Sequence, residues 1–185
     1  MANRSAQPEC RYCSRRQVLL GLAGTLVVPL VLLPQEIARA STSAAAIVVS
    51  CIDFRFIEPI HDFLGQQNLL GRCDWVALAG ASLALADFPR SADSEALWDQ
   101  LTFSVQLHQI QRVLLFDHAD CGAYTALYPQ LSAESVRERA VHQSYLQRAR
   151  EQITKHYPQL QVEPYFVSLL GQVVSLSPQE NLEGL

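Results

Sequence analysis

The chain has 185 residues, of which 49% are hydrophobic and 17% are charged, and its formal net charge at neutral pH is −4. This length is typical of one domain, and the composition excludes a disordered or collagen-like chain. An acidic chain without a stripe of basic residues is also a poor candidate for a nucleic-acid-binding protein, because those proteins neutralise phosphates with lysine and arginine.

The first 40 residues differ in composition from the rest. A polar, basic stretch containing Arg15 and Arg16 precedes an apolar run from Val18 to Leu33, and the small residues of Ala38–Ala40 follow. This order predicts a twin-arginine-type export signal over residues 1–40 that is cleaved after export, so that the chain meets a membrane only through this segment. The alternative is an uncleaved anchor, but the apolar run is shorter than the roughly 20 residues that a spanning helix needs.

We therefore expect a mature domain of residues 41–185 in the periplasm or the thylakoid lumen, because both compartments receive twin-arginine substrates. Residues 1–40 hold five arginines and two glutamates, so their removal changes the net charge from −4 to −7. Cys51, Cys73 and Cys121 remain, and an odd number argues against a pure disulfide framework. The alternatives are one disulfide with a free thiol, or two metal thiolates with Cys73 as a bystander.

The pattern of apolar residues predicts strands that alternate with helices. Short apolar runs indicate buried strands over residues 44–51, 74–80 and 111–118. Helices are predicted over 57–67, over 94–109 with Ser94 as cap, after Gly122, and over 132–156. Residues 81–93 are expected to be a loop, and 162–176 a last strand or a hairpin around Gly171. The order predicts an α/β domain with a central, mostly parallel β-sheet of about four strands flanked by helices.

Polar side chains follow two of the predicted strands. Cys51, Asp53 and Arg55 end the first, and His118 and Cys121 end the third. Ligands collect at the carboxyl ends of parallel strands, so the two thiols and the imidazole are expected to meet there. They form a tetrahedral zinc set with one open position, where a bound water would be acidified. Asp53 would hold that water by a hydrogen bond, and Arg55 would keep Asp53 ionised.

Cys-x-Asp-x-Arg followed by His-x-x-Cys-Gly, each after an apolar strand, resembles the β-class carbonic anhydrase family from about residue 45 to 175. The resemblance implies Zn²⁺ on Cys51, His118 and Cys121, an Asp53–Arg55 dyad, and reversible hydration of CO₂ to bicarbonate through zinc-bound hydroxide. A homodimer is also implied. Family members occur in an open state, in which the aspartate pairs with the arginine, and a closed state, in which it takes the fourth metal position.

Three departures from the family pattern keep alternatives open. Phe54 stands where the family usually has serine, residues 77–88 lack its arginine–asparagine pair, and cleavage after residue 40 leaves no room for its helical arm. A second hypothesis is therefore a non-catalytic zinc-binding protein, built on the same fold, that serves an interaction or structural role. A third is a zinc hydrolase acting on a small molecule such as carbon disulfide or carbonyl sulfide.

The remaining polar residues near the motifs receive structural interpretations. Asp117 is expected to point away from the metal, and Asp120 to be solvated or to cap a turn. Gly122 is expected to permit a tight turn from strand to helix. The other histidines are expected on the surface or on helix faces: His61, His108, His142 and His156. His61 follows the first motif and is the best candidate among them for a proton shuttle.

Overall fold

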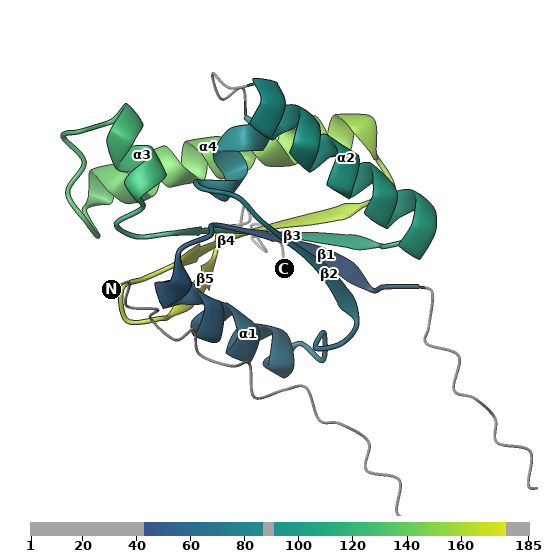
Figure 1. The fold of residues 1–185 in the computed structure, drawn as a ribbon. Coiled ribbons are helices and arrows are strands. Elements are labelled where there is room, and N and C mark those ends of the chain that lie inside the picture. The colour runs from purple at the N-terminus through teal and green to yellow at the C-terminus, as the bar shows by residue number, and fades with distance from the viewer. Residues whose placement is uncertain (1–42, 87–90, 177–185) are drawn as a thin grey trace, which may run out of the picture. The chain divides into compact units, whose positions relative to one another are not determined.

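A five-stranded sheet lies at the centre of the domain (Figure 1). The computed structural model describes residues 43–86 and 91–176, so the predicted export signal lies outside the described residues. The strands are β1 (Ala46–Ser50), β2 (Cys73–Ala77), β3 (Arg112–His118), β4 (Gln161–Val167) and β5 (Val173–Ser175). Their order is β2-β1-β3-β4-β5, and only the β4–β5 pair is antiparallel. The predicted α/β sheet is confirmed. The sheet has five strands and not four, because residues 162–176 form a hairpin of two strands, the second of the two structures expected for this segment.

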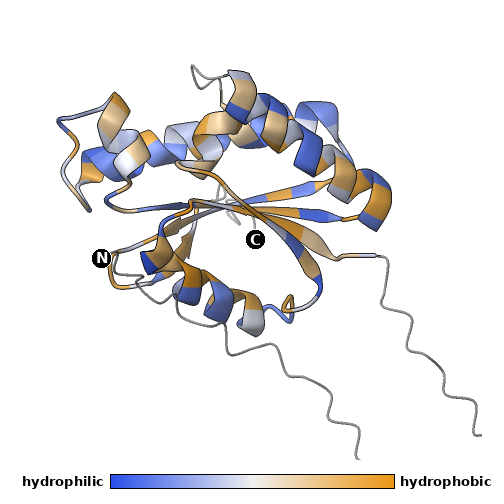
Figure 2. Cartoon of the chain, viewed as in Figure 1, coloured by the Kyte–Doolittle hydropathy of each residue, from blue (hydrophilic) through white to orange (hydrophobic). Residues whose placement is uncertain are grey.

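Helices cover both faces of the sheet. One face carries α1 (Ile57–Gln66), and the other carries α2 (Ser91–His108), α3 (Gly122–Leu127) and α4 (Val136–His156) (Figure 1). Two short 3₁₀ helices, η1 (Phe54–Phe56) and η2 (Ala81–Leu85), follow β1 and β2. Figure 2 shows apolar residues concentrated in the central strands and interrupted by hydrophilic residues along the helices. This is the pattern of a parallel sheet that is shielded from water on both sides.

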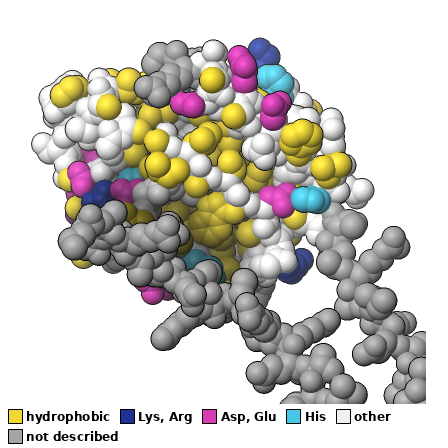
Figure 3. Space-filling view, in the orientation of Figure 1, with side chains coloured by type: hydrophobic (Ala, Val, Ile, Leu, Met, Phe, Trp, Pro, Cys, Tyr) yellow, Lys and Arg dark blue, Asp and Glu magenta, His cyan; other side chains and the backbone are white. Residues whose placement is uncertain are grey.

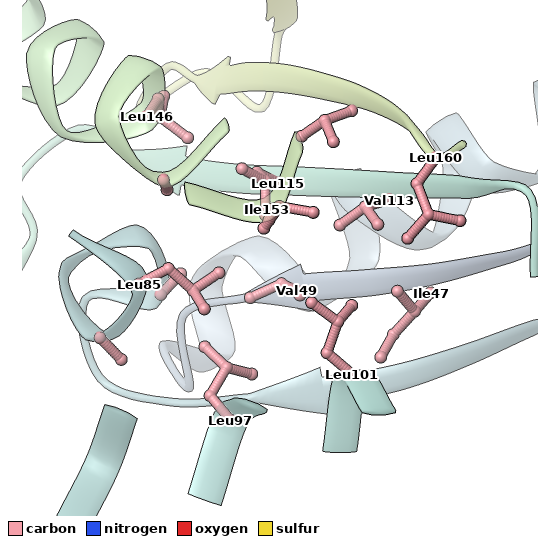
Figure 4. Close-up of a cluster of buried hydrophobic side chains, with 14 of the residues drawn as sticks. Ile47, Val49, Leu85, Leu97, Leu101, Val113, Leu115, Leu146, Ile153 and Leu160 are labelled. Atoms are coloured by element: carbon pink, nitrogen blue, oxygen red, sulfur yellow. The ribbon is translucent and has the colours of Figure 1, made fainter. Parts of the chain in front are cut away.

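The hydrophobic core consists of two main layers separated by the sheet. Alternate residues of β1 point to opposite faces, so Ile47 and Val49 pack in the layer under α2 and α4, whereas Val48 packs in the layer over α1. Figure 4 shows the first layer, in which Leu101 of α2 and Ile153 of α4 approach the strands. The continuous burial of β1 explains why its sequence is an unbroken apolar run.

Several predicted boundaries differ from the structure. Residues 81–93, expected to be a loop, contain η2 and the first turn of α2. Helix α2 begins at Ser91, so Ser94 lies inside it and is not its cap. Helix α4 begins at Val136, where the hydroxyl of Ser135 accepts a hydrogen bond from Glu138 N. Within the described residues, no helix combines the length and apolar character needed to span a bilayer.

Candidate metal centre

The ends of β1 and β3 bring together the three predicted metal ligands. The two strands are parallel neighbours, with Ser50 in register with Phe116, so both chains leave the sheet at the same edge. Cys51 directly follows β1, His118 ends β3, and Cys121 is the residue before α3. The ligand atoms of the three side chains lie within 4.8 Å of one another. His118 and Cys121 are buried and Cys51 is half-buried.

The donor set fits a zinc ion. The Sγ atoms of Cys51 and Cys121 are 3.9 Å apart, and two thiolates bound tetrahedrally at about 2.3 Å would be separated by about 3.8 Å. His118 Nδ1 lies 2.8 Å from the carbonyl oxygen of Ala119 and donates to it, which leaves Nε2 as the lone-pair nitrogen. This Nε2 is buried and has no hydrogen-bond partner among the described residues. A buried imidazole nitrogen without a hydrogen-bond partner beside two thiols fits the role of a metal ligand.

The two thiols differ in acidity because they share one small space. The contact with Cys121 lowers the pKa of Cys51 to about 4 against the opposing effect of burial, and His118 and the N–H of Gly80 contribute in the same direction. The same contact raises the pKa of Cys121, and its burial acts in the same direction. Without a cation the pair therefore retains one proton, since two adjacent thiolates repel each other. Both sulfurs become thiolates only when a cation neutralises them.

Asp53 and Arg55 form a bidentate ion pair beside the thiols. Arg55 Nη2 donates to Asp53 Oδ2 at 2.7 Å, and Arg55 Nε donates to Asp53 Oδ1 at 3.1 Å. The guanidinium lowers the pKa of Asp53, so its carboxyl group is ionised at neutral pH. This pairing is the one described above for the open state of the family. The same guanidinium reaches Asp120, whose Oδ2 accepts from Nη1 at 2.9 Å.

A pocket of about 540 Å³ opens onto this group. Its lining is mostly apolar or backbone apart from the ion pair and one thiol: Cys51, Ile52, Asp53, Phe54, Arg55, Ala79, Gly122 and Ala123. Phe54 lines the pocket and is 81% exposed, so it stands at the rim. The ring of Phe56 stacks on His118 with centroids 4.1 Å apart and restricts the plane of the imidazole.

A buried network of polar side chains around Asp117 lies next to the metal centre, and only part of it could be predicted from the sequence. Asp117 Oδ2 accepts hydrogen bonds from Ser82 Oγ at 2.6 Å, Tyr124 OH at 2.6 Å and His142 Nδ1 at 3.0 Å. Asp117 is thus occupied away from the ligand atoms, as expected. Of the two positions expected for His142, the surface or a helix face, the structure shows the second: it lies on the inner face of α4 with its side chain fully buried. Helical spacing is the signal that could have placed it, since His142 lies four residues before the buried Leu146 on the inner face of α4.

Other expectations near the site are corrected or remain open. Asp120 is not simply solvated, because it pairs with Arg55. Gly122 does not supply the tight turn, since Asp120 is the residue with a left-handed φ of 57°. Cys73 is a half-buried free thiol at the start of β2, at the other end of the strands from the centre. His61 lies exposed on α1 and does not line the pocket, and its role as a proton shuttle stays a prediction.

Comparison with solved structures supports the same fold. A chain from the structures of tetrameric β-carbonic anhydrases of Sordaria macrospora aligns with a TM-score of 0.51 and 16% identity, over 74% of this chain and 82% of the matched one. The β-carbonic anhydrase CcaA aligns with a TM-score of 0.50 and 13% identity, over 72% of this chain and 74% of the other. At these identities the likeness concerns the fold.

Comparison of sequences establishes the family. An uncharacterised protein of Rickettsia conorii, RC0076, is 32% identical over 139 residues, which cover 75% of each chain. An uncharacterised protein of Rickettsia bellii is 31% identical over 141 residues, covering 75% of this chain and 85% of the relative. Residues 41–177 match the family described as "Putative carbonic anhydrase". The strand-end ligand cluster, the fold and this match agree, and the chain belongs to the carbonic anhydrase-like family.

Proposed function

We propose that this chain is an exported, zinc-dependent carbonic anhydrase that interconverts CO₂ and bicarbonate. The observation that carries the proposal is the convergence of Cys51, His118 and Cys121 beside an ionised Asp53 held by Arg55. Two thiols and one imidazole form the ligand set of a catalytic zinc site that keeps a position open for water. A purely structural zinc site closes its fourth position with another protein ligand, and the described cluster holds three.

The protein residues have distinct roles in the proposed reaction. Zinc, when bound, acidifies a water molecule and so supplies a nucleophile near neutral pH. Asp53 accepts a hydrogen bond from that nucleophile and orients it. Arg55 keeps Asp53 ionised and holds its two oxygens in a fixed plane. The alanine and phenylalanine side chains of the pocket present an apolar wall suited to CO₂, which carries no charge. The proton released on hydration passes to buffer or to a shuttle group.

The proposal is tested by stopped-flow CO₂ hydration together with zinc analysis on the same sample. We expect about one zinc per chain, with loss of both zinc and hydration in Cys51→Ala. Cys73→Ala is the matched control, because it removes a half-buried thiol that is not a ligand. Asp53→Asn is expected to retain zinc and to lose hydration by about 100-fold or more, since the amide accepts fewer hydrogen bonds and carries no charge.

A different outcome would favour the non-catalytic hypothesis. Phe54, exposed at the pocket rim in place of the family's usual serine, is the feature that motivates it. A sample with one zinc per chain that does not hydrate CO₂ between neutral and alkaline pH would refute the proposal that this chain is a carbonic anhydrase. Hydration that persists in Cys51→Ala would refute the assigned metal centre instead.

Export is proposed from the sequence of residues 1–40. The test is the replacement of Arg15 and Arg16 together by lysine in a bacterium with a twin-arginine export system. We expect the unchanged chain in the exported fraction with a mature amino terminus at Ser41. The double lysine variant is expected in the cytoplasm with its full mass. Export of both chains to the same extent would refute the twin-arginine assignment.

A homodimer is proposed as the assembly. Support comes from the solved relatives of Sordaria macrospora, which are described as tetrameric, and from apolar side chains that are exposed on this domain. Figure 3 shows hydrophobic side chains gathered on the face between the upper helices and α1. The large exposed hydrophobic side chains of the edge strand β2 and of α2 are Trp75, Phe103 and Leu107. Light scattering coupled to gel filtration distinguishes a dimer from a monomer.

A further inference from the structure

The loop between His118 and Cys121 contains a residue in an unusual backbone conformation. Asp120 has a φ of 57°, in the left-handed region that only a small fraction of non-glycine residues adopt. This residue directly precedes Cys121, so its conformation determines where the second thiol lies relative to His118. A loop that relaxed to an extended conformation at Asp120 would move Cys121 Sγ away from its position 3.9 Å from Cys51 Sγ.

Two side chains from other parts of the fold hold Asp120 in this conformation. Arg55 donates from Nη2 to the carbonyl oxygen of Asp120 at 3.1 Å and from Nη1 to its carboxylate at 2.9 Å. Glu138, in the first turn of α4, accepts a hydrogen bond from the backbone N–H of Asp120 at 2.7 Å. The N–H, the carbonyl and the carboxylate of Asp120 are therefore all bound by side chains distant in the sequence. Arg55 already belongs to the candidate site, whereas Glu138 has no role in the proposed chemistry.

The hydrogen bonds of the Glu138 carboxylate differ from those that a glutamate at this position of a helix usually forms. Ser135 and Glu138 have the spacing of a capping box, in which the glutamate side chain normally accepts from the backbone N–H of the capping serine. Here the serine half is present, since Ser135 Oγ accepts from Glu138 N at 3.0 Å. The carboxylate is directed elsewhere: Oε1 binds Asp120 N, and Oε2 binds Glu134 N at 2.5 Å.

The burial of Glu138 shows that this arrangement is specific. Glu138 is only 3% exposed. Its carboxylate forms no ion pair within residues 43–86 and 91–176. A buried carboxylate needs compensation, which here comes from backbone N–H donors at the start of a helix. Glu134, the second donor, also has a left-handed φ of 54°. One buried carboxylate thus accepts hydrogen bonds from two residues with a left-handed φ, and one of them lies between two metal ligands.

We propose that Glu138 is a positioning residue of the metal centre, which acts by holding Asp120 so that Cys121 faces Cys51 and His118. This inference rests on the proposed metal centre and extends it to a residue outside the ligand set and the Asp53–Arg55 pair. The consequence is that the metal affinity and the ligand geometry depend on the reach of the Glu138 carboxylate.

The experiment compares metal binding by full-length chains in which Cys10 and Cys13 are replaced by serine, so that their thiols do not compete. Co²⁺ is the probe, because its visible bands report tetrahedral geometry and its thiolate charge-transfer band reports sulfur ligation. Glu138→Met preserves side-chain length and removes both acceptor oxygens. Glu138→Asp preserves the charge at the start of α4 but withdraws the carboxylate by one methylene group. Ser135→Ala is the control, since it weakens the same helix start without touching Asp120.

We expect Glu138→Met to bind Co²⁺ 10- to 100-fold more weakly than the parent chain, the range typical of lost partners around metal ligands, with weakened tetrahedral bands. We expect Glu138→Asp to lose at least threefold, and Ser135→Ala to match the parent within twofold. Glu138→Asp retains the helix charge, so it decides the question even where Glu138→Met does not fold. Parent-like binding by Glu138→Asp, or an equal loss in Ser135→Ala, would overturn the inference. A parent chain that binds no Co²⁺ or Zn²⁺ would instead refute the metal centre itself.

Discussion

The substitution Asp117→Asn tests how much the buried network behind the metal centre contributes to stability. The carboxylate is almost fully buried and accepts four hydrogen bonds, from the backbone and hydroxyl of Ser82, from Tyr124 and from His142. Three of these bonds converge on Oδ2. The amide of asparagine is therefore expected to keep its oxygen there and to place its –NH₂ against the N–H of Ser82.

The magnitude follows from these contacts. Hydrogen bonds to a charged group contribute about 1 kcal/mol more than neutral ones, so three of them weaken by about 3 kcal/mol in total. The unpaired N–H of Ser82 costs a further 1–3 kcal/mol or so. Removing a buried charge offsets part of this sum, and we expect a net loss of about 2–4 kcal/mol in the free energy of unfolding. That is a large fraction of the roughly 5–15 kcal/mol of a typical domain.

The assay is urea unfolding of the metal-free protein, because bound metal would add its own stabilisation. Asp62→Asn is the matched control. It removes the same charge from a side chain that is 70% exposed on α1, and its effect is expected to stay below about 0.5 kcal/mol. A loss of less than about 1 kcal/mol in Asp117→Asn, or equal losses in the two variants, would show that the network is not the stabilising unit described above.

Three further substitutions test separate parts of the structure. Gly80→Ala places a Cβ 2.5 Å from a leucine side chain at a φ of 76°, so we expect about 1–3 kcal/mol lower unfolding free energy in the same assay; unchanged stability would contradict this. Arg55→Lys loses the bidentate contact with Asp53, so hydration should fall about tenfold or more, and an unchanged rate would argue against the dyad. Burial opposes ionisation of Glu163, but the hydrogen bonds from Arg112 and Tyr165 and the charge of Arg112 together outweigh it and lower the pKa of Glu163. Its stabilisation is therefore complete above the unfolded carboxyl pKa of about 4.3 and is lost as the pH falls through the lower folded value. The deficit of Glu163→Gln in unfolding free energy should shrink from pH 7 to pH 3.5, and an equal deficit at both would contradict the linkage.

Much of the fold could be predicted because it depends on short-range pattern. The apolar run at Ile47–Val49 must be buried on both faces, which indicates a parallel sheet. The boundaries of α2 and the existence of η2 could not be predicted, because the alanine and leucine side chains of residues 81–86 fill space between the sheet and the helices. Only the packing shows that this segment is part of the core. A local pattern of small residues does not distinguish it from a loop.

The sequence by itself determined which side chains end the strands: Cys51, Asp53 and Arg55 after one, His118 and Cys121 after another. It also determined the family, since these residues carry its two motifs. Only the tertiary structure decided that β1 and β3 are neighbours although β2 lies between them in the sequence, and this adjacency brings the three ligands within 4.8 Å. The roles of His142 and Glu138 were likewise decided in three dimensions. Asp117 and Asp120, the partners of these two residues near the centre, lie far from them in the chain, and no local spacing encodes those contacts.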